Sequence, residues 1–319
     1  PLPASVQWEV LDKAATSLMQ LYAELIRQAG QGKVLYNDDT TMKILELSKE
    51  ASLGKGSGRS GNFTSGIVST FDDKQVAVFL TGQNHAGENL DRLLEQREEI
   101  LGIPIQMCDG LPASASVSFD TIVSNCLAHA RRKYVDCANS FPEECEYVLK
   151  ALKIVYENDA HTQAKKMSDE GRLAYHNAHS KKLMSDLKKW LEKQFREKLV
   201  EPNSSLGEAI QYMKKRWKKL TQFLRIPGAP LDNNICERAL KKAILHRKNS
   251  LFYKTTRGAL VGDLFMSFIH TAELAKANPF DYLITVLGNI KEAKQSPENW
   301  MPWNYKEATE SVEATKISQ

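Results

Sequence analysis

The sequence predicts an α/β fold in which a mixed sheet is flanked by helices. Short apolar runs typical of strands fill much of the first third of the chain, and nearly everything after residue 109 places apolar residues at helical spacing. With 319 residues, 42% of them hydrophobic, the chain is long enough to bury a sizeable core. These observations indicate a sheet-containing core joined to a large helical part.

The first third contains one long helix followed by four strand-like runs. Residues 6–28 have helical spacing and precede Gly30 and Gly32, which end a helix. The predicted strands are 33–39, 63–71, 75–81 and 104–109, with a hairpin turn at 72–74 and a helix at 88–101. The first and fourth of these strands end in acidic residues.

The rest of the chain is predicted to be helical, apart from a break at Pro227–Pro230 and a polar tail that we expect to fray beyond Tyr305. The predicted helices are 119–140, 143–167, 173–200, 206–223, 233–245, 259–276 and 279–292. We divide the chain into an N-terminal helical segment (1–32), the first part of the core (33–140), a helical insertion (141–226), the C-terminal helical part of the core (227–296) and a tail (297–319).

Composition excludes several classes of protein. The chain has no apolar stretch of about 18 residues, and its start has neither a basic region nor an apolar segment, so we expect a cytosolic protein without membrane contact. The first residue is Pro1, which predicts a fragment or a processed chain from which an upstream domain is missing. The five Cys form no CxxC pair and are predicted to be reduced core residues.

Charge is distributed unevenly along the chain. Residues 181–260 contain 20 Lys and Arg against 7 Asp and Glu, a local charge of +13 within a total of +4, so the remainder carries −9. A cationic segment of this kind is typical of a polyanion-binding surface, and a set of solvated amphipathic helices is the alternative interpretation.

Two strand ends suggest an acidic site. Asp38 and Asp109 each follow a predicted strand. Carboxylates repel one another unless a cation lies between them, and Mg²⁺ prefers a few such hard oxygen ligands. Two ions about 4 Å apart can activate water and stabilise the leaving oxygen of a phosphodiester. Strand-end acids also form turns and cap helices, which is the alternative.

A third carboxylate, Glu237, lies near the start of a predicted helix that Asp232 or Asn233 can cap. Cations occupy the same and neighbouring stripes of this helix, an arrangement that suits a metal site which also holds a phosphate backbone. Glu237 and Lys241 could instead form an ordinary i, i+4 surface pair.

Five motifs then carry a resemblance to a known family. They are Asn-Asp-Asp-Thr (37–40), Cys-Asp-Gly (108–110), Cys-Leu-Ala-His-Ala-Arg-Arg-Lys-Tyr (126–134), Pro-Leu-Asp-Asn-Asn-Ile-Cys-Glu-Arg-Ala-Leu (230–240) and His-Arg-Lys-Asn-Ser-Leu-Phe (246–252). In this order they resemble the DDE transposases of the insertion-sequence-66 family, from about residue 11 to residue 287. Leu127 and Ser250 stand where that family usually has Trp, and Lys241-Lys242 where Arg-Pro is common.

The resemblance implies an RNase H-like fold with a helical insertion before the last catalytic helix. It implies that Asp38, Asp109 and Glu237 are catalytic and bind two Mg²⁺ or Mn²⁺ ions, with Asp39 a rival to Asp38. The implied partner is double-stranded DNA, both transposon ends and target, held by a homo-oligomer. The implied location is the cytoplasm of a bacterial-type cell, associated with the nucleoid.

Several further residues are candidates for DNA contact or for the site. We expect phosphate contacts from basic residues in the matching motifs and beside them, namely Arg131, Arg132, Arg238, Lys241, Lys242, Arg247, Lys248 and Lys254. His129 and Asn233 are further site candidates, and for His129 a packing role is the alternative. The Gly-rich run at 54–62 lacks the Lys of a phosphate-binding loop. Trp217, within a Lys-rich run, could stack on a base or face the core.

The resulting hypothesis is a metal-dependent transposase domain that hydrolyses a phosphodiester at a transposon end and joins the freed 3′-OH to target DNA. Two alternatives stay open. One is an RNase H-like nuclease such as a resolvase, which cleaves without joining, and the other is a catalytically dead DNA-binding remnant.

Overall fold

The computed structural model describes residues 2–53, 59, 61–71 and 74–317. It confirms the predicted α/β class, with both antiparallel and parallel strand pairs, and is compatible with an RNase H-like fold. The chain forms two compact units. Unit 1 consists of Pro1–Pro104, Ala113–Thr121 and Ile235–Gln319, and unit 2 of Ile105–Pro112 and Ile122–Asn234. Each unit is described by itself.

Unit 1 contains an antiparallel sheet in the order β3-β2-β1 and the helices around it. Its strands are β1 (Val34–Thr41), β2 (Phe63–Phe71) and β3 (Lys74–Gly82). Its helices are α1 (Ala4–Gly30), α2 (Leu45–Ser52), α3 (Ala86–Leu94), η1 (Glu99–Leu101), η2 (Pro112–Ser114), α9 (Asn234–Ser250), α10 (Thr256–Leu274), α11 (Pro279–Gly288), α12 (Ile290–Gln295), η4 (Pro297–Trp300) and α13 (Tyr305–Ile317).

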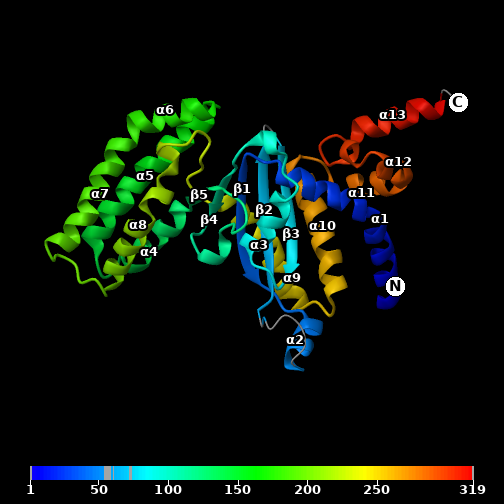
Figure 1. The fold of residues 1–319 in the computed structure, drawn as a ribbon, viewed down its shortest axis with the longest axis horizontal. Coiled ribbons are helices and arrows are strands. Elements are labelled where there is room, and N and C mark those ends of the chain that lie inside the picture. The colour runs from blue at the N-terminus through cyan, green and yellow to red at the C-terminus, as the bar shows by residue number, and fades with distance from the viewer. Residues whose placement is uncertain (1, 54–58, 60, 72–73, 318–319) are drawn as a thin grey trace. The chain divides into compact units, whose positions relative to one another are not determined.

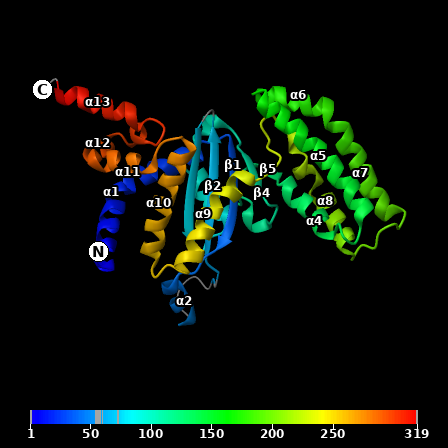
Figure 2. The same cartoon turned by 180° about the vertical axis from the view of Figure 1, so that it is seen from behind.

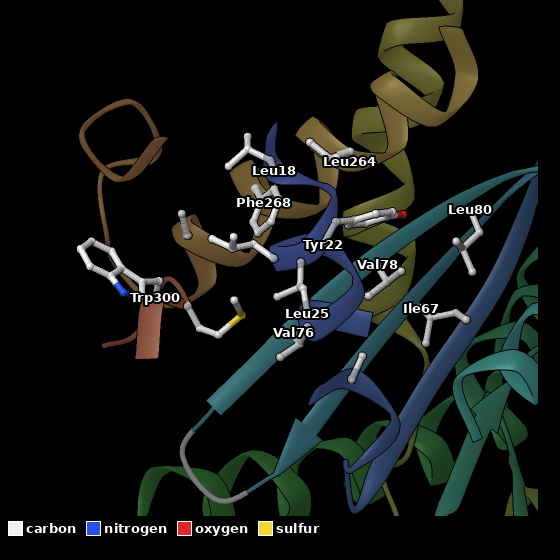
Figure 3. Close-up of a cluster of buried hydrophobic side chains, with 14 of the residues drawn as sticks. Leu18, Tyr22, Leu25, Ile67, Val76, Val78, Leu80, Leu264, Phe268 and Trp300 are labelled. Atoms are coloured by element: carbon white, nitrogen blue, oxygen red, sulfur yellow. The ribbon is translucent and has the colours of Figure 1, made fainter. Parts of the chain in front are cut away.

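The two faces of this sheet are covered by different helices, because side chains alternate between faces along a strand. Helices α1 and α3 pack on one face (Figure 1), where Val76 and Val78 of β3 meet Leu25 of α1 and Phe268 of α10 (Figure 3). Helix α9 lies on the opposite face (Figure 2), where its Leu240 belongs to a second apolar cluster. Both faces of the sheet are therefore buried.

Helix α10 covers the free edge of β3 with hydrogen bonds from its side chains. Thr271 Oγ1 accepts a bond from Ala77 N (3.0 Å), and Ser267 Oγ accepts one from Phe79 N (2.9 Å). One turn earlier, the buried Asp263 Oδ2 accepts one from Thr81 N (2.6 Å). The alternate amides of an edge strand point outward, so these three bonds pair the donors that no strand reaches.

The three bonds can form together because four residues of a helix and two residues of a strand span nearly the same distance. Four residues along a helix rise about 6 Å, and two residues along a strand rise about 6.6 Å. Asp263, Ser267 and Thr271 are spaced by four residues, so successive side chains meet successive outward amides. The polar stripe of α10 thus accepts the hydrogen bonds that a neighbouring strand would otherwise accept from β3.

Unit 2 is a parallel strand pair followed by a helical bundle. Strand β4 (Ile105–Cys108) pairs with β5 (Ile122–Asn125) in the register Cys108↔Asn125. The helices are α4 (Leu127–Cys137), α5 (Pro142–Ala164), α6 (Asp169–His179), α7 (Lys181–Arg196), α8 (Ser205–Leu220) and η3 (Gln222–Leu224). Their apolar faces share one core, which includes Tyr134 and Met213.

Five predictions about secondary structure are wrong in part. The helix predicted over 88–101 ends at Leu94, and a short 3-10 helix follows at Glu99–Leu101. The helix predicted over 279–292 is two helices, α11 and α12, on either side of Asn289. The helix predicted from residue 119 begins at Leu127, since the β-branched run before it forms β5 against β4. The helix predicted over 173–200 is two helices that meet at the buried Ser180, whose hydroxyl bonds to His176 and Asn158. The tail does not fray at Tyr305, because that residue is buried and begins α13.

Other predictions stand as follows. The strands at 33–39, 63–71, 75–81 and 104–109 are confirmed within a few residues, and the hairpin residues 72–73 lie outside the described residues. All five Cys are buried free thiols, as predicted. No helix in the part of the chain that the structure describes is long and apolar enough to cross a membrane. The division into five segments stays a prediction.

The buried Asp263 carboxyl should make stability depend on pH. Burial raises its pKa to about 7, although the bonds from Thr81 act to lower it. The folded chain therefore prefers the protonated form. The stability that this preference adds is complete below pH ~4, near the pKa of an unfolded Asp, and is lost as the pH rises through about 7.

We expect Asp263→Asn to remove this dependence. Urea unfolding of the native chain and the variant at about pH 5 and pH 8 should show the native chain losing at least ~1 kcal/mol relative to the variant over that interval. Asp281→Asn, at an exposed acid of α11, is the matched control and should run parallel to the native chain. If the native chain and Asp263→Asn differed in free energy of unfolding by the same amount at both pH values, the prediction would be contradicted.

Candidate metal and DNA-contacting site

Asp38 and Asp39 are neighbours on β1 and face opposite sides of the sheet. Asp39 pairs with Ser65 across the β1–β2 ladder, and its carboxylate accepts bonds from Ser65 Oγ (2.6 Å) and from Ala86 N (2.9 Å), the first amide of α3. His85 Nδ1 lies 3.1 Å from the same carboxylate. Asp39 therefore ties α3 to the sheet and helps to begin that helix.

Asp38 faces the other side, where α9 packs. Its partner in the ladder is Gly66 of β2, and directly opposed residues share one face. A side chain at Gly66 would approach Leu240 Cγ to 2.8 Å, so the glycine is what lets α9 come close to the sheet here. Cys236 Sγ donates to Gly66 O (3.1 Å), which fixes the first turn of α9 beside Asp38.

Glu237 follows Cys236 in the first turn of α9. Burial raises the pKa of the Cys236 thiol well above its ordinary value, and the charges of Asp38, Glu237 and Asp39 raise it further. All three carboxylates thus act on the same buried thiol. A helix start carries a partial positive charge, which favours an acid at this position.

The donor chemistry of this pair fits a divalent ion. Asp38 and Glu237 supply hard carboxylate oxygens from two rigid elements on one face of the sheet. Mg²⁺ and Mn²⁺ prefer such ligands, with water completing the coordination shell.

Asp109 belongs to unit 2 and lies in the turn that leaves β4. Its Oδ1 accepts a bond from Leu111 N (2.9 Å), which closes a tight local turn. Its backbone carbonyl accepts a bond from Tyr212 Oη of α8 (3.0 Å). The next residue, Gly110, has φ +87°, in the left-handed region that favours glycine.

The remaining site candidates lie at helix starts in unit 2. His129 is half-buried in the first turn of α4. Asn233 is fully buried just before α9, and its backbone N–H donates to Cys126 Sγ (3.3 Å). Asp232 Oδ1 accepts a bond from the backbone amide of Asn234, the first residue of α9.

The predicted DNA-contacting cations of unit 1 fall into two groups. Lys242 forms an ion pair with Glu273, and Arg247 bonds to Thr40 and Thr41 at the end of β1. The other four are exposed, three of them on one solvent-facing stripe of α9. These exposed cations are Arg238, Lys241, Lys248 and Lys254.

In unit 2, Arg131 and Arg132 are exposed on α4 and line a groove of about 910 Å³ between α4 and α5. Lys150 and Lys153 line the same groove from α5 and form ion pairs with acids one turn away. The groove therefore has cations on both helices, together with Glu146 of α5. Trp217 packs against the core of the bundle, as the apolar interpretation expects, and residues 54–58 and 60 of the Gly-rich run lie outside the described residues.

An α/β protein with carboxylates at a strand and a helix start is compatible with the RNase H-like class. The chain matches the family described as Transposase IS66 family over residues 2–260, and it belongs to that family. This confirms the resemblance that its five motifs carry.

The chain is 26% identical over 318 residues to the uncharacterized protein y4hP of Sinorhizobium fredii (strain NBRC 101917 / NGR234), covering 93% of this chain and 55% of that protein. It is 32% identical over 186 residues to the uncharacterized protein y4jD of the same organism, covering 57% of this chain and 35% of that protein. The chain thus spans about half, or less, of these relatives. No solved structure matches it.

Sequence reasoning missed three residues that shape these sites. Gly66 and Cys236 bring α9 close to β2, and Tyr212 holds the turn at Asp109. The isolated Gly66 inside a strand pattern was the one available signal, since such a glycine marks close approach of another element. Nothing in the helical pattern around Tyr212 distinguishes it from an ordinary packing residue.

The two neighbouring acids should respond differently to loss of charge. Asp39→Asn removes an acceptor for Ser65 and the α3 amide, and should lower the free energy of unfolding by ~1–3 kcal/mol. Asp38→Asn keeps an oxygen for its bond from Asp39 N (2.8 Å) and removes a charge that acts on the buried Cys236 thiol of α9. In chelator it should unfold at the same or a higher urea concentration than the native chain. Equal destabilisation by both variants would refute this assignment.

Proposed function

We propose that this chain is the catalytic part of a cut-and-paste DNA transposase in which Asp38, Asp109 and Glu237 hold two divalent ions, Mg²⁺ or Mn²⁺. The observation that carries the proposal is that Asp38 shares the α9 face of the sheet with the start of the helix bearing Glu237, while Asp39 is engaged by α3. We include Asp109 because of its Cys-Asp-Gly motif (108–110). That it approaches the other two acids is part of the proposal.

The proposed reaction has two steps at phosphorus. Water first breaks the bond to a 3′ oxygen at a transposon end, leaving a 3′-OH and a 5′-phosphate. That 3′-OH then attacks a target phosphodiester, so one target bond breaks as one new bond forms and a target 3′-OH is released. When bound, the divalent ions would activate the attacking oxygen and stabilise the leaving one.

The roles of the protein residues follow from their elements. Asp38 is held by the β1–β2 ladder and Glu237 by a helix fixed to that ladder, so neither carboxylate must be ordered during the reaction. Exposed cations on α9 and in the α4–α5 groove would hold phosphates without reading sequence. Because two transposon ends must be joined to one target, we propose at least a dimer on DNA.

Removal of any one acid should abolish metal-dependent chemistry. We expect Asp38→Asn, Asp109→Asn and Glu237→Gln each to lower Mg²⁺-dependent nicking of supercoiled plasmid by at least ~100-fold, since metal ligands act as a unit. Asp120→Asn, at an exposed acid of unit 1, is the control and should keep native activity.

A second assay separates transposition from simple cleavage. Duplexes that end in the element's terminal sequence and carry a free 3′-OH should be joined to target plasmid by the native chain. Cleavage without joining would indicate a resolvase-type nuclease. Undiminished DNA binding with no nicking, unchanged by Glu237→Gln, would indicate a remnant without catalysis.

The groove cations should account for part of the DNA affinity. We expect the double variant Arg131→Ala/Arg132→Ala to bind all duplex sequences more weakly and to reduce the slope of log affinity against log salt by about 2. The double variant Lys182→Ala/Lys189→Ala is the matched control, because both lysines are exposed on α7 beside Asp186. An equal loss in both variants would show that the effect reflects net charge alone.

A further inference from the structure

Helix α8 carries a clamp on the turn that presents Asp109. Tyr212 Oη donates to Asp109 O (3.0 Å), and one turn later Arg216 Nη2 donates to Gly110 O (3.4 Å). Two successive carbonyls of the turn are therefore held by two side chains on one face of a single helix.

The clamp is itself held in place by charge and by packing. The Arg216 guanidinium lies 4.2 Å from the centre of the Tyr212 ring, and Lys133 Nζ of α4 lies 4.9 Å from it. Contacts of this kind favour one position of the ring.

The backbone of this turn is closely packed at Gly110. A side chain at Gly110 would lie 2.9 Å from Arg216 Nε and 3.1 Å from Asn125 Cγ. Asn125 is at the end of β5, where its amide faces Cys108 Sγ (3.7 Å). The backbone at Gly110 is thus enclosed between β5 and α8, while the Asp109 side chain stays only half-buried.

We infer that Tyr212 and Arg216 are positioning residues for Asp109, and that helix α8 fixes this acid in the orientation that a divalent ion requires. The inference rests on the proposed function. It assigns the helical region between Asp109 and Glu237 a second role besides DNA contact, because its α8 sets the geometry of the second acid. Outer contacts of this kind typically change metal affinity by about 10–100-fold when removed.

The test measures metal binding directly, without DNA. Mn²⁺ binding to the full chain is titrated by electron paramagnetic resonance for the native chain, Tyr212→Phe and Arg216→Ala. Tyr212→Phe keeps the ring and loses only the hydroxyl, and we expect its Mn²⁺ affinity to fall by about tenfold. Arg216→Ala should weaken binding by a similar factor. Tyr147→Phe, at an exposed tyrosine of α5 in the same unit, is the matched control and should bind as the native chain does.

Two further readouts separate positioning from folding. The midpoint of thermal unfolding should change little in Tyr212→Phe, and the Mg²⁺ concentration for half-maximal nicking should rise with its KM for DNA unchanged. Native Mn²⁺ binding that Tyr212→Phe leaves intact would overturn this inference alone. If the native chain bound no Mn²⁺ and Asp38→Asn left nicking unchanged, the proposed function would fail, and the inference with it.

Discussion

The structure of unit 1 depends on the polar stripe of α10 along the edge of β3. Strand β3 is an edge strand, and an uncovered edge would leave a row of amides without partners and would invite association with another strand. Asp263, Ser267 and Thr271 remove that problem, and they also fix where α10 lies. Because α9 joins α10 through a short connection, the placement of one helix limits the other. That connection is pinned as well, since Tyr253 bridges to Ile44 just beyond β1.

As a consequence, the neighbouring residues Asp38 and Asp39 have different roles. A strand sends successive side chains to opposite faces, so Asp39 can serve the fold on the α3 face while Asp38 stays on the α9 face. A shift of one residue in the β1–β2 register would exchange these positions. Gly66, which pairs with Asp38 in this ladder, also makes room for the helix that carries Glu237.

This arrangement explains what the sequence could predict and what it could not. The first four strands were predictable because each contains an apolar run that ends in polar residues. Strand β5 was missed because its short run leads directly into α4 and was included in the predicted helix, and because it forms against β4. The choice between Asp38 and Asp39 depends on which face meets α3, a tertiary fact that no local pattern encodes. The clamp at Asp109 depends on a residue 103 positions away.

A metal site benefits when the fold already holds its ligands in position. In unit 1 neither Asp38 nor Glu237 lies on an element whose position depends on the site. Strand β1 is paired along its length with β2, and α9 is fixed by Cys236, by its apolar contacts and by the Tyr253 bridge. The fold therefore sets the positions of Asp38 and Glu237 independently of the proposed site. Such preorganisation is what the proposed metal site requires, since an ion would not have to order its ligands.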